Sequence, residues 1–151
     1  MLDDLDRRIL RQWQADPTLS PAELAERCGM TPARVQRRQM RLMDTGAVKG
    51  VRAVIDWQAL GYSVEVSLRV TLDKTVAAAF DEFLKAAREV PEVVEIQTFL
   101  GRVDVRLSVI AQDMGHYQRV YRTRVLTLPH IADIEPLMHV ARIKADERLP
   151  I

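Results

Sequence analysis

The stretch Thr31-Pro-Ala-Arg-Val-Gln-Arg-Arg-Gln-Met-Arg-Leu-Met43 contains four arginines at the spacing i, i+3, i+4 and i+7. In a helix with 3.6 residues per turn, this spacing puts all four guanidinium groups on one side, which we call the arginine face. It consists of Arg34, Arg37, Arg38 and Arg41. Like charges this close repel each other, so the pattern favours an anionic partner such as DNA phosphate, and guanidinium also pairs bidentately with guanine. A solvated helix without a partner is the alternative that this stretch alone leaves open.

The residues before this stretch predict two more helices. Ser20-Pro-Ala-Glu23 has the form of a capping box with proline at the first helical position, and Gly29 suits the left-handed residue that ends a helix. Thr31-Pro32 repeats the cap-and-proline start. Two short helices joined by a glycine-containing turn form a helix-turn-helix, whose second helix enters the major groove of DNA. An earlier helix over Leu2 to Trp13, capped by Asp3 or Asp4, would complete a three-helix core.

Positive charge is concentrated around the predicted second helix. Between Arg27 and Arg52 the chain has seven basic residues and one acidic residue, whereas its overall formal charge is +1. Local phosphate attraction requires such a distribution. We therefore expect Thr31 and the arginine face to contact DNA, Thr31 through its amide or hydroxyl. The alternation of apolar and basic residues over Val48 to Ile55 predicts a short hairpin or wing.

Composition narrows the remaining function classes. A chain of 151 residues that is 48% hydrophobic can form one full core or two small ones. It has no stretch apolar enough to span a bilayer and no signal-peptide pattern. Its single cysteine, Cys28, excludes an internal disulfide. We therefore expect a cytoplasmic protein without membrane contact. We expect no catalytic residue, cofactor or metal, because the sequence lacks a catalytic motif and its three histidines are dispersed. These are His116, His130 and His139.

From Ser63 onward the hydrophobic pattern changes to that of an α+β domain. Val64, Val66, Leu68 and Val70 alternate with polar residues, which predicts a strand with one buried face. The segments that follow predict a helix over Thr75 to Val90, with Phe80 among its inward residues, strands over Val93 to Leu100 and Val103 to Ile110, a helix over Asp113 to Leu126, and a strand over Ile131 to Ile143 broken or bulged at Pro136. This order is the ferredoxin-like βαββαβ arrangement. We expect a winged-helix-like helix-turn-helix domain at 1–55, a linker at 56–62 and the ferredoxin-like domain at 63–151.

Together these residues resemble the Lrp/AsnC family of leucine-responsive and asparagine-responsive transcription regulators. The resemblance runs from end to end and is carried by Leu2-Asp-Asp-Leu-Asp-Arg-Arg-Ile-Leu10, Glu23-Leu-Ala25, Arg37-Arg38, Arg41-Leu42, Gly46, Pro91-Glu-Val-Val-Glu95, Leu128-Pro129 and Leu149-Pro-Ile151. It implies a regulator that binds double-stranded DNA. It also implies homodimers that assemble into tetramers or octamers, with a small effector, usually an amino acid, bound between dimers.

The implied effector site departs from the family pattern. Relatives often carry Gly-Asp-x-Asp followed by an aromatic residue, whereas this chain has Gly101-Arg-Val-Asp-Val105, which reverses one charge. The resemblance makes Gly101, Arg102, Asp104 and Pro136 the candidate effector-binding residues. Three alternatives remain: a site retuned toward ligands with a second carboxylate, with Asp104 pairing the ligand's ammonium group; a lost site; or an Arg102 that lies outside an intact pocket.

Two other functions compete with the effector-modulated regulator. An architectural protein would wrap DNA without an effector, and the altered turn is compatible with that. Sirohaem decarboxylases resemble the same two-domain family, but they carry histidines around the middle strands, and Val93 to Leu100 contains none. For assembly, two helices can cover only one face of a four-stranded sheet. We therefore expect a partner chain to cover the face with Glu65, Ser67, Arg69 and Thr71, and no stable monomer at micromolar concentration.

Overall fold

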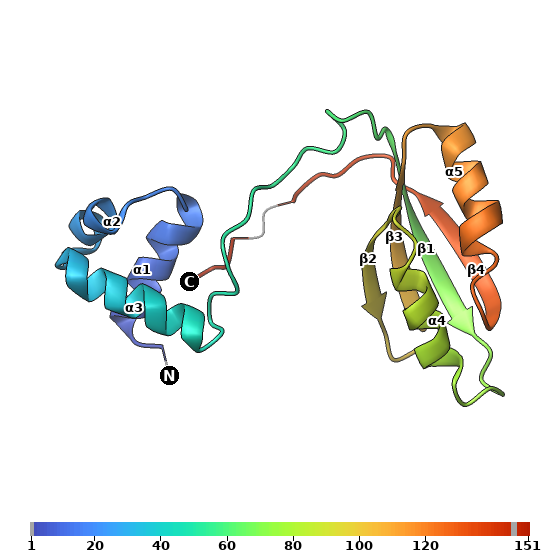
Figure 1. Cartoon of the computed structure of the whole chain (residues 1–151), viewed down its shortest axis with the longest axis horizontal. Coiled ribbons are helices and arrows are strands. Elements are labelled where there is room, and N and C mark those ends of the chain that lie inside the picture. Colours follow the sequence, from blue (N-terminus) through green and yellow to red (C-terminus); the bar gives the residue numbers. More distant parts are fainter. Residues whose placement is uncertain (1, 146–147) are drawn as a thin grey trace. The chain divides into compact units, whose positions relative to one another are not determined.

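The computed structural model describes residues 2–145 and 148–151 and divides the chain into two compact units (Figure 1). The first unit comprises Met1–Val54 together with Lys144–Ile151, and the second comprises Ile55–Ile143. The C-terminal residues thus belong with the helical unit. There Gln14 pairs with the backbone of Leu149, donating to its carbonyl and accepting from its amide, each at 2.9 Å.

The first unit is a three-helix bundle made of α1 (Asp4–Ala15), α2 (Pro21–Cys28) and α3 (Pro32–Asp44). Both predicted capping positions are confirmed: Asp3 caps α1 in a capping box with Asp6, and Ser20 caps α2 in one with Glu23. Gly29 ends α2 in the left-handed conformation with φ 65°, as its position predicts. Together the three helices bury a small core of Ile9, Leu19, Leu24, Ala25, Cys28, Val35 and Leu42.

The prediction of a hairpin or wing after α3 is wrong. Residues 48–55 contain no strand, and the side chains of Val51, Val54 and Ile55 are exposed at 57%, 88% and 62%. A strand needs a neighbouring strand to satisfy its backbone groups and a core to cover its apolar side chains. Val48 packs against the core of this unit, but the described residues of the unit supply no neighbouring strand. Alternation of apolar and basic residues therefore did not suffice to form a wing.

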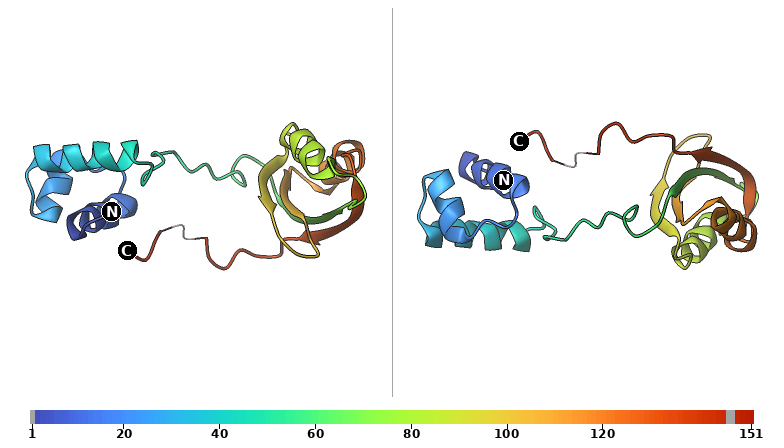
Figure 2. Two further views of the ribbon diagram at one scale, coloured as in Figure 1. Left: turned by 90° about the horizontal axis from the view of Figure 1, so that it is seen from below. Right: turned by 90° about the horizontal axis from the view of Figure 1, so that it is seen from above.

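The second unit has the predicted βαββαβ order. Its elements are β1 (Val64–Leu72), α4 (Ala79–Arg88), β2 (Val93–Thr98), β3 (Val105–Ala111), α5 (Met114–Val120), the π-helical turn η1 (Tyr121–Val125) and β4 (Ile131–Met138). The strands form one antiparallel sheet in the order β2-β3-β1-β4. Helices α4 and α5 lie on one face of this sheet (Figures 1 and 2). This is the ferredoxin-like arrangement.

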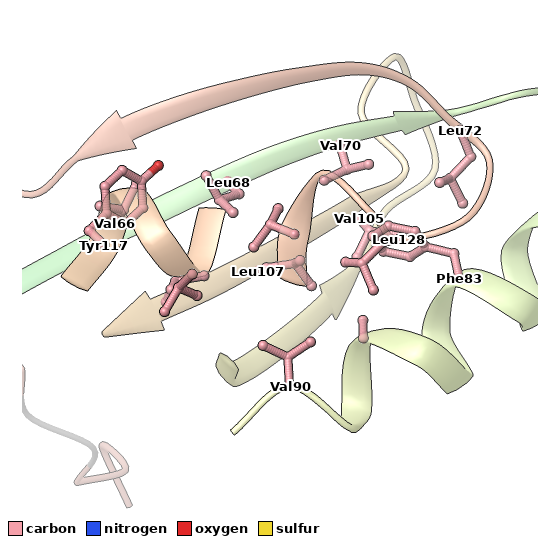
Figure 3. Packing of buried hydrophobic residues seen from close by; sticks show 14 of the residues in the cluster. Val66, Leu68, Val70, Leu72, Phe83, Val90, Val105, Leu107, Tyr117 and Leu128 are labelled. Carbon is pink, nitrogen blue, oxygen red and sulfur yellow. The ribbon is translucent and has the colours of Figure 1, made fainter. Parts of the chain in front are cut away.

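The alternation in β1 places its apolar residues against the helices. Val66, Leu68 and Val70 are fully buried and pack with Phe83 of α4 and Tyr117 of α5 (Figure 3). The polar residues of β1 lie on the opposite face of the sheet, as predicted for period-two alternation.

Several element boundaries differ from the predictions. Helix α4 begins at Ala79 rather than Thr75, and Phe80, expected to point inward, lies in its first turn and is 41% exposed. Strand β4 ends at Met138 and runs through Pro136 without a break. An edge strand tolerates proline, since half of its backbone amides face no neighbouring strand.

Candidate DNA-binding and effector sites

The arginine face divides into two pairs with different surroundings. Arg34 and Arg37 are exposed, and neither makes an ion pair within the residues that the structure describes. Both lie in the first half of α3, close to its N-terminus. Thr31 is the N-cap residue of α3, but its side chain makes no capping hydrogen bond, so the hydroxyl does not satisfy a helix amide. These three residues present hydrogen-bond donors at one exposed helix end.

Arg38 and Arg41 instead contact the start of α1. Arg38 Nη1 lies 2.7 Å from Oδ1 of Asp3 and 2.7 Å from Oδ1 of Asp6, and Arg41 donates to Oδ2 of Asp6. The Asp6 side chain is fully buried, while that of Arg38 is 16% exposed and that of Arg41 is 51% exposed. The cluster of Asp3, Asp6, Arg38 and Arg41, which we call the α1–α3 ion cluster, joins the two helices.

The ion cluster also explains the shifted pKa values there. The hydrogen bond from Arg38 lowers the pKa of Asp3 to about 2, with a contribution from the backbone amide of Asp6. The same contacts with Asp3 and Asp6 raise the pKa of Arg38. Sequence reasoning assigned Asp3 to helix capping and did not foresee its second role. The acids at positions 3 and 6 were the available signal, because their i, i+3 spacing places both near the same helix end.

A second candidate site surrounds the turn between β2 and β3. A pocket of about 470 Å³ is lined there by Arg69, Phe99, Leu100, Gly101, Arg102, Val103 and Arg106. Two of the four predicted effector residues, Gly101 and Arg102, therefore line one pocket. Arg69 and Arg106 join them because they are register partners on β1 and β3. The sequence did not single out either of these two arginines as a site residue.

The other two predicted residues are not among the lining residues of this pocket. Asp104 is buried; its Oδ2 accepts a hydrogen bond of 2.8 Å from the amide of Leu72, and its Oδ1 pairs with the ammonium of Lys74. The hydrogen bond from Lys74 is the main cause that lowers the pKa of Asp104. Pro136 lies on β4 opposite Leu68. Asp104 therefore holds the β2–β3 turn to the end of β1 through its contacts with Leu72 and Lys74.

Two further observations concern sites of other kinds. A pocket of about 350 Å³ lies at the start of β1, where Glu65 accepts a hydrogen bond of 2.7 Å from Arg142. No group of three or more His, Cys, Asp or Glu side chains in the described part of the chain is arranged to hold a metal ion. Among the described residues, no helix is long and apolar enough to cross a membrane.

Comparison with known proteins assigns both units. Residues 2–43 match the model of the AsnC-type helix-turn-helix domain, and residues 65–149 match that of the Lrp/AsnC ligand binding domain. The chain is 29% identical over 150 residues to the leucine-responsive regulatory protein of Klebsiella pneumoniae, covering 99% of this chain and 92% of that protein. It is 32% identical over 143 residues to the proline dehydrogenase transcriptional activator of Rhizobium radiobacter, covering 95% and 92%.

Solved structures agree with this assignment. A transcriptional regulator from Neisseria meningitidis, in a complex with L-Met, superimposes with a TM-score of 0.91 at 26% identity, covering 99% of this chain and 97% of that one. An AsnC family regulator from Agrobacterium tumefaciens gives a TM-score of 0.89 at 29% identity, with the same coverage. These relatives are transcription regulators and not enzymes. With both of its units matched in order, the chain belongs to the Lrp/AsnC family of DNA-binding transcriptional regulators, which act under the control of small effectors.

Proposed function

We propose that Arg34 and Arg37 of α3 make the principal contacts with double-stranded DNA, and that Thr31 donates to a phosphate at the helix start. The observation that carries this proposal is the exposure of both guanidinium groups, with no carboxylate partner within the described residues, on the second helix of a helix-turn-helix. An unpaired guanidinium keeps its full charge for a phosphate or a guanine edge. We assign this DNA-binding domain to residues 1–55 and a linker to 56–62, whereas the compact units divide between Val54 and Ile55 and place Lys144–Ile151 with the first unit.

Arg38 and Arg41 have different roles in this proposal. Arg38 is largely buried between Asp3 and Asp6, so its charge is neutralised within the protein and it holds α3 against α1. Arg41 pairs with Asp6 on one side and is half exposed, which leaves part of its guanidinium for DNA. The ion cluster therefore sets the orientation of α3, from which Arg34 and Arg37 project.

The experiment that tests this function measures DNA binding of Arg37→Ala as a function of salt. If Arg37 contacts only a phosphate, the substitution should lower the affinity for all DNA sequences and reduce the slope of log affinity against log salt concentration by about one. If Arg37 contacts a base, the substitution should instead reduce the preference for that base at one position by roughly 1–3 kcal/mol. Arg88→Ala is the matched control, because Arg88 is an exposed arginine of α4 in the other unit. Parental DNA binding by both Arg34→Ala and Arg37→Ala would contradict the assignment of α3.

For assembly, we propose homodimers that associate through the face of the sheet opposite the helices, and then tetramers or octamers. Support comes from the one-sided core, which leaves this face uncovered within the second unit. Ser67 and Ser108 face each other in register at its centre, with Arg69 and Glu135 beside them. Sedimentation should show no monomer at micromolar concentration. A stable monomer there would refute the proposed assembly.

For regulation, we propose that a small effector binds beside the β2–β3 turn, where Gly101 and Arg102 line the pocket, Asp104 fixes the turn, and Pro136 acts only through the neighbouring strand. The L-Met complex of the Neisseria regulator supports an amino-acid-sized ligand for this fold. A ligand that binds the folded protein raises its melting temperature, so thermal-shift screening would detect it. Such a DNA-binding regulator would work in the cytoplasm.

An architectural protein that binds DNA without an effector is the second candidate. The observation that favours it is the engagement of Asp104 by Lys74 and the Leu72 amide, which gives both carboxylate oxygens a partner inside the protein. The two functions differ in the ratio of specific to non-specific affinity at equal salt. Equal binding of a candidate operator and of random DNA across a salt series would favour the architectural protein.

A further inference from the structure

The side of α3 that faces away from the core is not the arginine face. Helices α1 and α2 lie on one side of α3 (Figure 2), where Val35 and Leu42 enter the core. Because each residue turns a helix by about 100°, a different set of side chains lies on the outward side, and we call this set the outer stripe. It consists of Ala33, Gln36, Arg37 and Met40, all of them exposed. Arg37 belongs to both sets, so the outer stripe runs beside the arginine face.

The two central members of the outer stripe have no role within the protein. The side-chain amide of Gln36 makes no hydrogen bond to any described residue. Met40 is 58% exposed, so its apolar side chain contributes little to the core. At the spacing i, i+4 the two side chains are neighbours, with about 5–6 Å between their Cβ atoms. The helix therefore presents an unpaired amide next to an uncovered apolar group.

The major groove of DNA presents partners for both of these groups. A glutamine amide pairs with adenine through two hydrogen bonds, since it donates to N7 and accepts from the N6 amino group. Thymine presents its methyl group in the same groove, where an apolar side chain covers it. One turn of a helix rises about 5.4 Å, and base pairs follow each other at about 3.4 Å. Gln36 and Met40 can therefore reach base pairs that are one or two steps apart.

An acid limits how much of α3 can enter the groove. Asp44 follows Met40 by four residues on the same side of the helix, is exposed and makes no ion pair among the described residues. It is also the one acidic residue between Arg27 and Arg52. A carboxylate close to DNA phosphates is repelled, so the reading part of the helix ends before Asp44. This leaves the first three turns of α3, which carry the outer stripe.

We propose that the outer stripe determines the sequence preference of this regulator: Gln36 binds the major-groove edge of an adenine, and Met40 covers a thymine methyl group one or two base pairs away. The inference rests on the proposed function of α3 as the helix that contacts DNA, and it names the bases that this helix prefers. Arg34 and Arg37 supply charge for affinity, whereas the two uncharged side chains discriminate between base pairs.

The first test selects preferred sites from a library of random duplexes with the full-length parent and with each variant. Gln36→Ala should lose the preference for adenine at one position by roughly 5- to 150-fold. Gln36→Arg should prefer guanine at the same position, a change that a purely structural role would not produce. Because Gln36 is uncharged, Gln36→Ala should keep the parental slope of log affinity against log salt concentration. The matched control is Gln118→Ala, which replaces an exposed glutamine of α5 in the other unit and should select the parental site.

The second test examines Met40 with the site that the parent selects. Each thymine is replaced in turn by uracil, which lacks the methyl group. At one position this replacement should weaken binding by the parent roughly fourfold, because the transfer of one methyl group out of water is lost. Met40→Ala should bind the thymine and uracil forms of that position equally.

Selection of the parental site by Gln36→Ala or Gln36→Arg would overturn the adenine contact. An equal response of Met40→Ala and the parent to uracil would overturn the methyl contact. If the parent selects no preferred sequence, the inference fails and the architectural protein is favoured. If Arg37→Ala weakens DNA binding while the Gln36 variants keep the parental preference, this inference fails alone. Parental binding by both Arg34→Ala and Arg37→Ala would instead contradict the proposed function itself.

Discussion

Replacing Arg38 by alanine tests whether the α1–α3 ion cluster supports the fold or serves DNA. In the structure Arg38 contacts both Asp3 and Asp6, and the Asp6 side chain is fully buried. Removing one partner of a buried ion pair typically costs about 3–5 kcal/mol, because a charge is left in a poorly solvated place. Here Arg41 still pairs with Asp6, so we expect the free energy of unfolding to fall by roughly 2–4 kcal/mol.

The assay is denaturant unfolding followed by the fluorescence of Trp13, which packs against the core of the first unit. The chain has two tryptophans, so a Trp57→Phe background removes the signal of the second unit. Arg37→Ala is the matched control on the same helix. Because Arg37 is exposed, its replacement should change the stability by no more than about 0.5 kcal/mol while weakening DNA binding. Equal midpoints for Arg38→Ala and the parent would refute the structural role of Arg38.

Three further predictions concern titratable groups and one unsatisfied hydroxyl. The folded-state pKa of Asp3 is about 2, below its ordinary value of 3.8, so its contact with Arg38 stabilises the fold fully above about pH 4 and is lost as the pH falls toward 2. Acid titration of Trp13 fluorescence should show this loss in the parent and a smaller one in Asp3→Asn. The hydroxyl of Tyr117 is buried without a hydrogen-bond partner in the described structure, and burial raises its pKa to about 12. Tyr117→Phe should therefore leave the melting temperature unchanged or raise it, and a marked drop would indicate a partner for the hydroxyl. Burial also raises the pKa of the Cys28 thiol, so a thiol reagent should label it slowly in the native protein and rapidly after unfolding, and rapid native labelling would contradict its burial.

Local signals accounted for most of the secondary structure. The capping box at Ser20 and the glycine at position 29 fixed the two ends of α2, because both act through backbone groups within a few residues. The alternation in β1 predicted its buried face for a similar reason, since side chains alternate across any strand. The failed wing at 48–55 shows where such signals stop: an alternating pattern forms a strand only where another strand is available for pairing.

The candidate sites were predicted only in part. The spacing of the arginine face placed four guanidinium groups on one side of α3, and the helix geometry alone determines this. Which of them are free depends on the packing of α1 against α3, which brings Asp6 to Arg38 and Arg41 from more than thirty residues away. The turn at Gly101 and Arg102 was recognisable as a site, but its other two arginines were not.

By itself, the sequence determined the helix-turn-helix, the βαββαβ order and the positions of the arginines, because each of these follows from local backbone preferences and side-chain periodicity. Only the tertiary structure decided which charges are neutralised. Asp104 was an available acid in the sequence but is occupied by Lys74 in the fold, and Arg69 meets Arg106 only through the register of β1 with β3. The physical reason is that the electrostatic effect of a charged side chain depends on which groups lie near it. Long-range packing decides which groups these are, and local sequence spacing carries no information about them.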